Sequence, residues 1–237
     1  AQANAGHFTN DSNEGWKDWS NGTGEQAWMW KRHAGMDVVT YKGKPFYPNP
    51  EPHSLNAVPE MVWVKRRTSG TTRDWKVYHK GLNGGTNPEQ YGLVLNTDAS
   101  EVDDVALWQD TAPTSTHFTL GGSPSTNSET IDYIALLFAS VDGISKVGYY
   151  SGDDTNPRTI TTGFSPRMLL IKPLSASTNW MIWDSLRGLD ASGDEDYLFL
   201  DSTAAQAEAD YIDTTSTGFI LKAANNSGVN YIYYCHA

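Results

Sequence analysis

Residues 59–65, with the sequence PEMVWVK, decide the fold because residues 166–172, PRMLLIK, repeat them 107 positions later. In both stretches a proline comes first and an apolar run ends at a lysine. A short run rich in β-branched and aromatic residues is typical of a buried strand. A match of this kind indicates that the chain contains the same structural unit twice.

Further strand-like stretches match in the same order on both sides of this repeat. The offset falls from 107 to 98 along the unit, so the first copy has about nine extra residues, which we place in loops around 99–116 and 121–130. The matched pairs are 34–41 with 142–149, Trp75 with Trp180, 91–94 with 197–200, 118–120 with 219–221, and 133–135 with 231–233.

The composition favours an all-β protein. The 237 residues include 9 Trp, 12 Tyr and 21 Gly, and the strand-like runs are separated by Gly, Pro, Asn and Asp. Only residues 204–210 suggest a helix. We therefore predict two tandem antiparallel β-sandwich units, jelly-roll-like, at 34–139 and 140–237. Both copies could also interleave into one sandwich, since residues 133–139 can pair with either neighbour.

The first 33 residues form a separate part of the prediction. Residues 27–30, AWMW, resemble 231–234, YIYY, in the last strand of a unit. We therefore expect residues 1–33 to be an extended N-terminal arm and the tail of a preceding repeat. Because residue 1 is alanine, the chain is either processed or cut from a longer array.

Charge and cysteine content exclude several classes of protein. The formal net charge is −11, which makes nucleic acid an unsuitable partner. No window approaches the ~20 apolar residues of a membrane span, so we expect no membrane insertion. Cys235 is the one cysteine and cannot form an intrachain disulfide. These features indicate a soluble, disulfide-free protein.

Several motifs of the second copy occur together in a known family. They are 163–166 (GFSP), 171–172 (IK), 179–184 (NWMIWD) and 187–188 (RG), and the linking segment 134–143 between the two copies is also typical of that family. With these motifs, the sequence resembles the uncharacterised tandem repeat domain of virion structural and tail fibre proteins of tailed phages, especially those of marine cyanobacteria. The first copy departs from the pattern at 57–59 (AVP) and 74–79 (DWKVYH).

The resemblance implies a noncatalytic role in the phage particle, in a tail fibre or another adsorption structure. Its partners are then other virion proteins and a host-surface glycan, and its location is the virion, assembled in the host cytoplasm. Fibre proteins are commonly closed homotrimers, although the sequence does not determine the symmetry. The alternatives are a lectin-like carbohydrate-binding module, a capsid decoration and a polysaccharide depolymerase domain.

The residues that could perform chemistry favour structural roles. The six histidines have no metal-site spacing, and we expect no metal and no cofactor. Asp184 could serve a glycosidase, but an ion pair or loop clamp with Arg187 is the stronger reading. His79 aligns with Asp184, which favours solvent exposure or local pairing, and Cys235 is expected in the core. The sequence leaves open whether calcium binds the acidic loops at Asp153, Asp154, Asp190, Asp194 and Asp196.

Ligand recognition is the remaining possibility, and here aromatic and amide side chains matter. Flat rings pack on sugars, whereas Asp and Asn bind hydroxyl groups. The strand tryptophans Trp63, Trp75 and Trp180 are expected in the core. Gly-rich loops at 80–86, 121–128 and 225–228 are predicted to face a receptor. The candidate ligand-binding residues are Trp16, Trp19, Asn83, Asn127, Asn225 and Asn226, although a subunit contact or an arm anchor is favoured for the two tryptophans.

Overall fold

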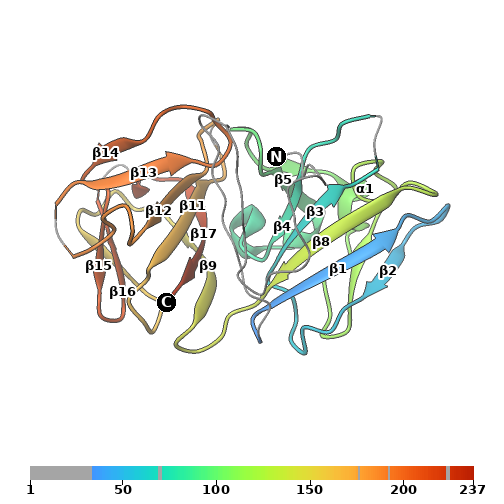
Figure 1. The fold of residues 1–237 in the computed structure, drawn as a ribbon, viewed down its shortest axis with the longest axis horizontal. Helices are drawn as coiled ribbons and strands as arrows, with labels where there is room; N and C mark the ends of the chain where they lie inside the picture. The colour runs from blue at the N-terminus through green and yellow to red at the C-terminus, as the bar shows by residue number, and fades with distance from the viewer. Residues whose placement is uncertain (1–33, 69–70, 176, 192, 223–224) are drawn as a thin grey trace, which may run out of the picture. The chain divides into compact units, whose positions relative to one another are not determined.

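The computed structural model describes residues 34–237 except 69–70, 176, 192 and 223–224. The predicted arm at 1–33, with Trp16 and Trp19, lies outside the described residues. The described chain is all-β, with two six-stranded antiparallel sheets and two smaller ones (Figure 1). The predicted fold class, two antiparallel β-sandwich-like units, is confirmed.

The first six-stranded sheet has the order β1-β8-β3-β4-β5-β6, and strands β2 and β7 form a small second sheet. All of these strands come from residues 36–138. Strand β8 pairs with β1 on one side and β3 on the other, so the two copies do not interleave. The bounds are β1 Met36–Lys42, β2 Asn49–Pro52, β3 Met61–Arg66, β4 Lys76–His79, β5 Tyr91–Val94, β6 Val102–Asp103, β7 His117–Leu120 and β8 Asp132–Phe138.

The second six-stranded sheet has the order β9-β17-β11-β12-β13-β14, and β10, β16 and β15 form its small partner sheet. Strand for strand, this order matches that of the first sheet. The bounds are β9 Ser145–Ser151, β10 Arg158–Thr161, β11 Met168–Pro173, β12 Met181–Asp184, β13 Glu195–Phe199, β14 Ala207–Ala209, β15 Ile212–Thr215, β16 Gly218–Leu221 and β17 Asn230–His236.

Strand pairing shifts two of the predicted matches by one residue. Tyr41 lies opposite Tyr133, and Tyr150 lies opposite Tyr231, so Tyr41 corresponds to Tyr150 rather than to Tyr149. Likewise, β5 pairs with β4 as β13 pairs with β12, and these pairings place β13 105 residues after β5, whereas the sequence match placed it 106 residues after. A shift of one residue turns every side chain of a strand to the opposite face, and only the hydrogen-bonded pairing of the strands determines the register.

The predicted helix is wrong. Residues 207–209 form β14, because pairing with β13 extends the large sheet there. The described α-helix is α1 (Val105–Trp108), where the Asp104 carboxylate accepts a hydrogen bond from the Ala106 N–H at 3.0 Å. Two 3₁₀ turns, η1 (Leu82–Gly85) and η2 (Pro88–Gln90), flank β5. Helix α1 is too short to show helical periodicity, which explains why the sequence pattern missed it.

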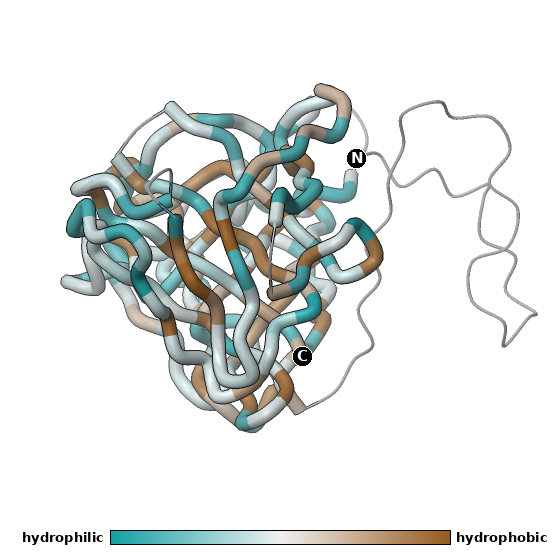
Figure 2. Tube along the Cα trace, turned by 90° about the vertical axis from the view of Figure 1, so that its left-hand side faces the viewer, coloured by the Kyte–Doolittle hydropathy of each residue, from teal (hydrophilic) through white to brown (hydrophobic). Residues whose placement is uncertain are grey.

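Each unit has its own core between its large and small sheets. In the first core Tyr41 stacks on Tyr133 at 5.2 Å, and in the second Tyr150 stacks on Tyr231 at 4.9 Å. Trp63 and Trp180 are buried as predicted, whereas Trp75 is half-buried. Figure 2 shows hydrophobic segments running through the fold and hydrophilic ones at many of its turns.

The same loop clamp occurs in both units. Tyr41 donates its hydroxyl to the Thr126 carbonyl at 2.6 Å, and Tyr150 donates to the Asn225 carbonyl at 2.8 Å. Beside each clamp a glycine packs against a backbone carbonyl. A Cβ atom on Gly43 would lie 2.1 Å from the Ser128 oxygen, and one on Gly152 would lie 1.7 Å from the Ser227 oxygen. Only glycine allows this approach.

An inter-repeat joint connects the units through Glu60, His79, Phe138, Ser140 and Tyr234. The Phe138 and Tyr234 rings lie 5.1 Å apart, and the Glu60 carboxylate accepts a hydrogen bond from the Ser140 N–H at 2.6 Å. Burial raises the Glu60 pKa, but hydrogen bonds from Lys80 and Ser140 outweigh it and leave the pKa below its usual value. The residue between the units is therefore held as a carboxylate.

Replacing either clamp glycine by alanine tests the close approach. We expect Gly43→Ala and Gly152→Ala each to lower the free energy of unfolding by about 1–3 kcal/mol, because a backbone carbonyl has little room to yield. Gly228→Ala, in the same loop as Ser227, is the control, since its nearest neighbour would lie 3.4 Å from the new Cβ. Urea denaturation measures all three. Equal stability of the three variants would contradict the clamp.

Candidate functional site

The predicted receptor-facing loop at 80–86 belongs to the joint instead. A Cβ on Gly81 would lie 2.3 Å from Tyr149 Cβ, so the loop packs directly on β9 of the second unit. Asn83 sits in η1 with a φ of 50°, and its side chain donates to the Thr86 carbonyl at 2.8 Å. Its backbone N–H donates to Glu101 Oε2 at 2.7 Å. Asn83 thus stabilises its own turn.

The other three candidate asparagines are buried in the structure. Asn127 is 4 % exposed, Asn225 2 % and Asn226 0 %. Asn127 and Asn226 hold equivalent loops, because their amides donate to the carbonyls of Phe46 and Thr155 at 3.0 and 2.6 Å. Asn127 and Asn226 therefore position loops.

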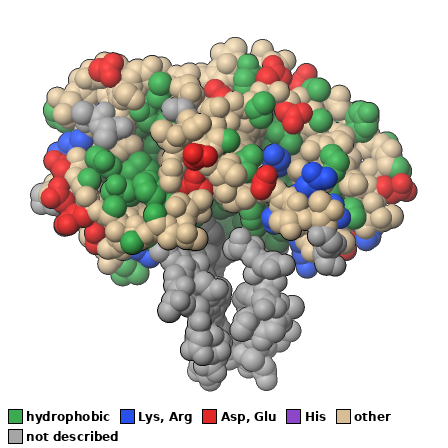
Figure 3. Space-filling model, turned by 90° about the horizontal axis from the view of Figure 1, so that it is seen from above, with side chains coloured by type: hydrophobic (Ala, Val, Ile, Leu, Met, Phe, Trp, Pro, Cys, Tyr) green, Lys and Arg blue, Asp and Glu red, His purple; other side chains and the backbone are tan. Residues whose placement is uncertain are grey.

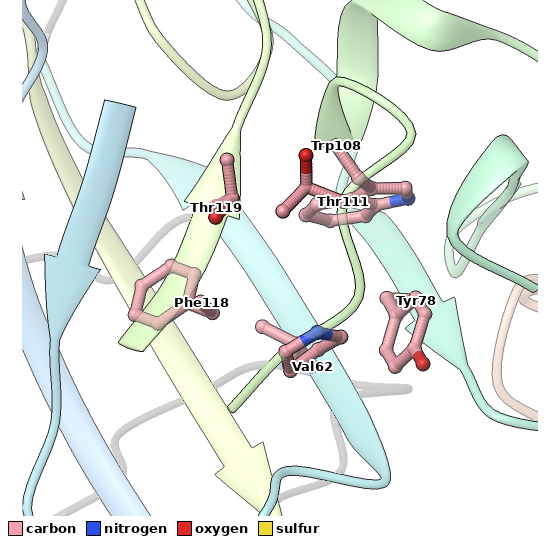
Figure 4. Close-up of a pocket in the computed structure, with 7 residues that line it drawn as sticks. Val62, Tyr78, Trp108, Thr111, Phe118 and Thr119 are labelled. Atoms are coloured by element: carbon pink, nitrogen blue, oxygen red, sulfur yellow. The ribbon is translucent and has the colours of Figure 1, made fainter. Parts of the chain in front are cut away.

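The first unit contains a small aromatic pocket, shown in Figure 4. Tyr78, Trp108 and Phe118 surround it, together with Val62 from β3. Its cavity volume is about 10 Å³, roughly the space of one water molecule and far below the ~300–1,000 Å³ typical of ligand sites. All three rings are at least 95 % buried, and Trp108 Nε1 donates to the Tyr91 carbonyl at 3.0 Å. We interpret this pocket as a packing gap of the core.

Two aromatic rings are instead presented to solvent on the loop between β1 and β2. Phe46 is 53 % exposed and Tyr47 62 % exposed. Pro45 and Pro48 flank the pair and restrict the backbone on both sides. Asn127 holds this loop in place with two hydrogen bonds. Its Oδ1 accepts a hydrogen bond from the Lys44 N–H at 2.8 Å, and its Nδ2 donates one to the Phe46 carbonyl. We call Phe46 and Tyr47 the aromatic platform.

Charged and amide groups adjoin the aromatic platform. Lys44 Nζ lies 5.9 Å from the centre of the Phe46 ring, 2.9 Å from Glu51 Oε1 and 2.8 Å from Asn49 Oδ1. The Tyr47 ring faces the loop at 121–128, where a Cβ on Gly122 would come within 2.9 Å of it. Rings beside hydrogen-bonding groups suit an amphipathic ligand such as a sugar.

Sequence reasoning missed the aromatic platform. Its signal is the run PFYP at 45–48, in which two aromatic residues lie between prolines and so cannot belong to a central strand. At the equivalent place the second unit has Thr155 and Asn156, so the platform belongs to the first unit only. In both units the peptide bond before the following proline is cis.

The residues nominated for catalysis have structural partners. Asp184 pairs with Arg187, and its Oδ1 accepts from the Leu186 N–H at 3.0 Å and from the Arg187 N–H at 3.2 Å, which is the predicted loop clamp. Cys235 lies in the second core, as predicted. Burial raises the pKa of its thiol to about 12, so the reactive thiolate is disfavoured.

His79 is fully buried in the joint, so the predicted solvent exposure is wrong. Its Nδ1 accepts from the Gly81 N–H at 2.9 Å, and its Nε2 lies 3.3 Å from the Tyr233 carbonyl. These partners require a neutral ring with the proton on Nε2. Desolvation lowers the His79 pKa to about 3. Local pairing was predicted, but the contact across the joint was not.

The acidic loops for which the sequence left calcium binding open have different surroundings in the structure. Asp153 pairs with Arg158 at 3.4 Å and accepts from Asn226 at 2.7 Å. Of the stretch 190–196, Glu195 is the residue that joins a three-carboxylate cluster, with Asp210 and Asp213. Burial and then Asp213 raise the pKa of Glu195 to about 7. Figure 3 shows Asp and Glu side chains spread over the face in view, in keeping with the net charge.

The buried His79 predicts a loss of stability in mild acid. Because its pKa is about 3 in the folded state and about 6.5 when unfolded, the unfolded chain binds more protons between these values. Stability therefore falls as the pH drops below 6.5, by about 2 kcal/mol from His79 at pH 5.

Chemical denaturation of the parent and of His79→Gln at pH 7 and pH 5 measures the contribution of His79 to the free energy of unfolding. Glutamine does not titrate, so we expect the free energy of unfolding to differ less between pH 7 and pH 5 in His79→Gln than in the parent. His117→Gln replaces an exposed histidine and serves as the control. If the free energy of unfolding of His79→Gln falls between pH 7 and pH 5 by as much as that of the parent, the assignment of the neutral ring is contradicted.

Comparisons with known proteins place the chain in a family without an assigned activity. Among the described residues, none forms a helix long and apolar enough to span a bilayer. No curated protein and no solved structure matches the sequence. One family model matches residues 9–237, which is nearly the whole chain. The protein belongs to the family described as Domain of unknown function (DUF7483).

Proposed function

We propose that the protein is a noncatalytic structural component of a tailed-phage particle, in a tail fibre or another adsorption structure. Its aromatic platform contacts a host-surface glycan, and its other partners are virion proteins. The observation that carries this proposal is the exposure of Phe46 and Tyr47 on a loop that Asn127 holds in place. An anchored pair of rings loses little conformational freedom on binding, which favours recognition.

The packing of one repeat against the other supports a structural role in the particle. The joint uses aromatic packing at Phe138 and Tyr234 and hydrogen bonds such as that from Trp180 Nε1 to the Val94 carbonyl at 2.9 Å. These contacts keep one repeat from turning freely against the next. Such a scaffold presents its loops at a constant spacing, which is useful in an adsorption structure and has no need of a catalytic centre.

The same platform is compatible with a lectin-like carbohydrate-binding module, which is the second candidate function. The phage structural component and the lectin-like module differ in whether the chain assembles into particles. Both candidate functions predict that glycan is bound without being cleaved. A capsid decoration needs no glycan, and a polysaccharide depolymerase shortens its polymer. Asp184 argues against the depolymerase, since its carboxylate is occupied by Arg187 and two backbone N–H groups.

Binding of the labelled chain to cyanobacterial cells and to their isolated surface polysaccharides tests the proposal. We expect saturable binding that the double variant Phe46→Ala/Tyr47→Ala weakens by about fivefold to 150-fold, since the loss of two ring contacts of about 0.5–1.5 kcal/mol each removes about 1–3 kcal/mol. Leu186→Ala is the control, because Leu186 is also a large apolar residue exposed to solvent, at 93 %, but belongs to the second unit.

Three outcomes separate the candidates. Equal binding of the double variant and Leu186→Ala contradicts a role of the platform. Shortened polysaccharide after incubation contradicts the noncatalytic role and favours the depolymerase. Absence of binding across the panel favours the capsid decoration, with other virion proteins as the partners.

A further inference from the structure

Three carboxylates of the second unit converge where its large sheet meets its small one. Glu195 begins β13, Asp210 directly follows β14, and Asp213 lies in β15. One oxygen of each lies within 4.8 Å of an oxygen of the other two. Folding brings them together, because β14 pairs with β13 before the chain crosses to β15 in the small sheet.

Burial distinguishes this cluster from an acidic surface loop. Glu195 is 0 % exposed, and no side chain donates a hydrogen bond to its Oε1 or Oε2, although the backbone N–H groups of Glu195 and Ile212 favour its charged form. Asp213 is also buried, and its Oδ1 has no hydrogen-bond partner. A buried carboxylate without a counterion is strongly destabilising. These three oxygens, none of which has a side-chain partner, therefore indicate that a positively charged ligand completes the site.

Lys222 supplies only part of the compensation. Its Nζ lies 2.7 Å from Asp213 Oδ2 and 3.4 Å from Asp210 Oδ1. The ammonium group thus faces the aspartates and leaves both oxygens of Glu195 without a side-chain partner. With all groups ionised, one ammonium against three carboxylates leaves two negative charges uncompensated.

The first unit has no such charge at the equivalent place. The pairing of β4 with β5 and of β12 with β13 aligns Gln90 with Glu195. The first unit therefore has a neutral amide at this position, at the end of η2, where the second unit has a carboxylate at the start of β13. The carboxylate of Glu195 is a feature of the second unit alone, and the fold does not require it.

We propose that Glu195, Asp210 and Asp213 bind a divalent cation of the calcium class. Such hard cations take six to eight oxygen ligands, from carboxylates, backbone carbonyls and water. Glu195 supplies a fully buried ligand and Asp213 a largely buried one, whereas Asp210 is exposed and leaves room for water on the solvent side. Calcium fits better than magnesium, because magnesium demands near-octahedral geometry and keeps most of its water. The site is independent of the aromatic platform.

Calorimetric titration of the full chain, after removal of metal with a chelator, tests the site. We expect calcium chloride to bind the parent chain and to raise its melting temperature, because a ligand that binds only the folded state stabilises it. Glu195→Gln keeps the shape and removes the charge, and we expect it to weaken calcium binding on the order of tenfold or more. Magnesium chloride should bind more weakly.

Glu208→Gln is the matched control, because Glu208 is an exposed carboxylate of β14, next to the cluster in sequence. It should bind calcium as the parent does. Absence of binding to the parent at up to about 10 mM calcium, above the ~1 mM constants of weak calcium modules, overturns the proposal. Parent-like binding by Glu195→Gln overturns it as well, since the cation then lies elsewhere.

A second variant addresses the competing ammonium group. Lys222→Met removes the positive charge beside Asp213, so calcium should bind it more tightly than the parent and should restore stability lost in metal-free solution. Weaker calcium binding by folded Lys222→Met contradicts the competition.

Terbium luminescence gives an independent readout, because Tyr211 adjoins Asp210 in sequence and its ring lies 5.5 Å from that of Tyr197. Terbium emission that calcium does not quench in the parent overturns the site.

Discussion

Burial of the large sheets on both of their faces constrains the rest of the described structure. Side chains alternate between faces along a strand, so a strand covered on one face shows alternating burial. In β17, by contrast, Tyr231 to Cys235 are all buried. One face of β17 lines the second core, and Tyr234 on the other meets Phe138 of the first unit. Each repeat therefore depends on its neighbour to cover apolar surface.

The joint also determines how its polar groups are satisfied. Lys172 is fully buried, and its Nζ donates to the carbonyls of Asp98, Pro173 and Thr178 at 2.6–3.2 Å. Desolvation lowers its pKa to about 8, although Asp201 and Asp98 favour the charged form. One of these carbonyls belongs to the first unit. The charge is thus held by backbone groups from both repeats, and one of its three partners, the Asp98 carbonyl, is present only when the two repeats are together.

The repeats share a backbone but differ in chemistry at equivalent places. Where the first unit has Phe46, the second has Thr155, although an asparagine amide binds the carbonyl of each. Where the second has Glu195, the first has Gln90. Duplication of a stable sandwich leaves loops and strand ends free to change, because packing determines the core positions and not these. The aromatic platform and the carboxylate cluster are therefore separate features of one scaffold.

The sequence by itself determined the all-β class, the duplication and the order of the strands, because apolar runs and their punctuation depend on local chemistry that survives in both copies. It also identified the Asp184 clamp, whose partner lies three residues away. Tertiary structure alone decided the register of β1 and β5, the burial of Asn127 and Asn226, the place of His79 in the joint and the meeting of Glu195 with Asp213. Each of these depends on contacts between residues far apart in the chain, and a periodic pattern carries no information about which distant segment will lie beside a given residue.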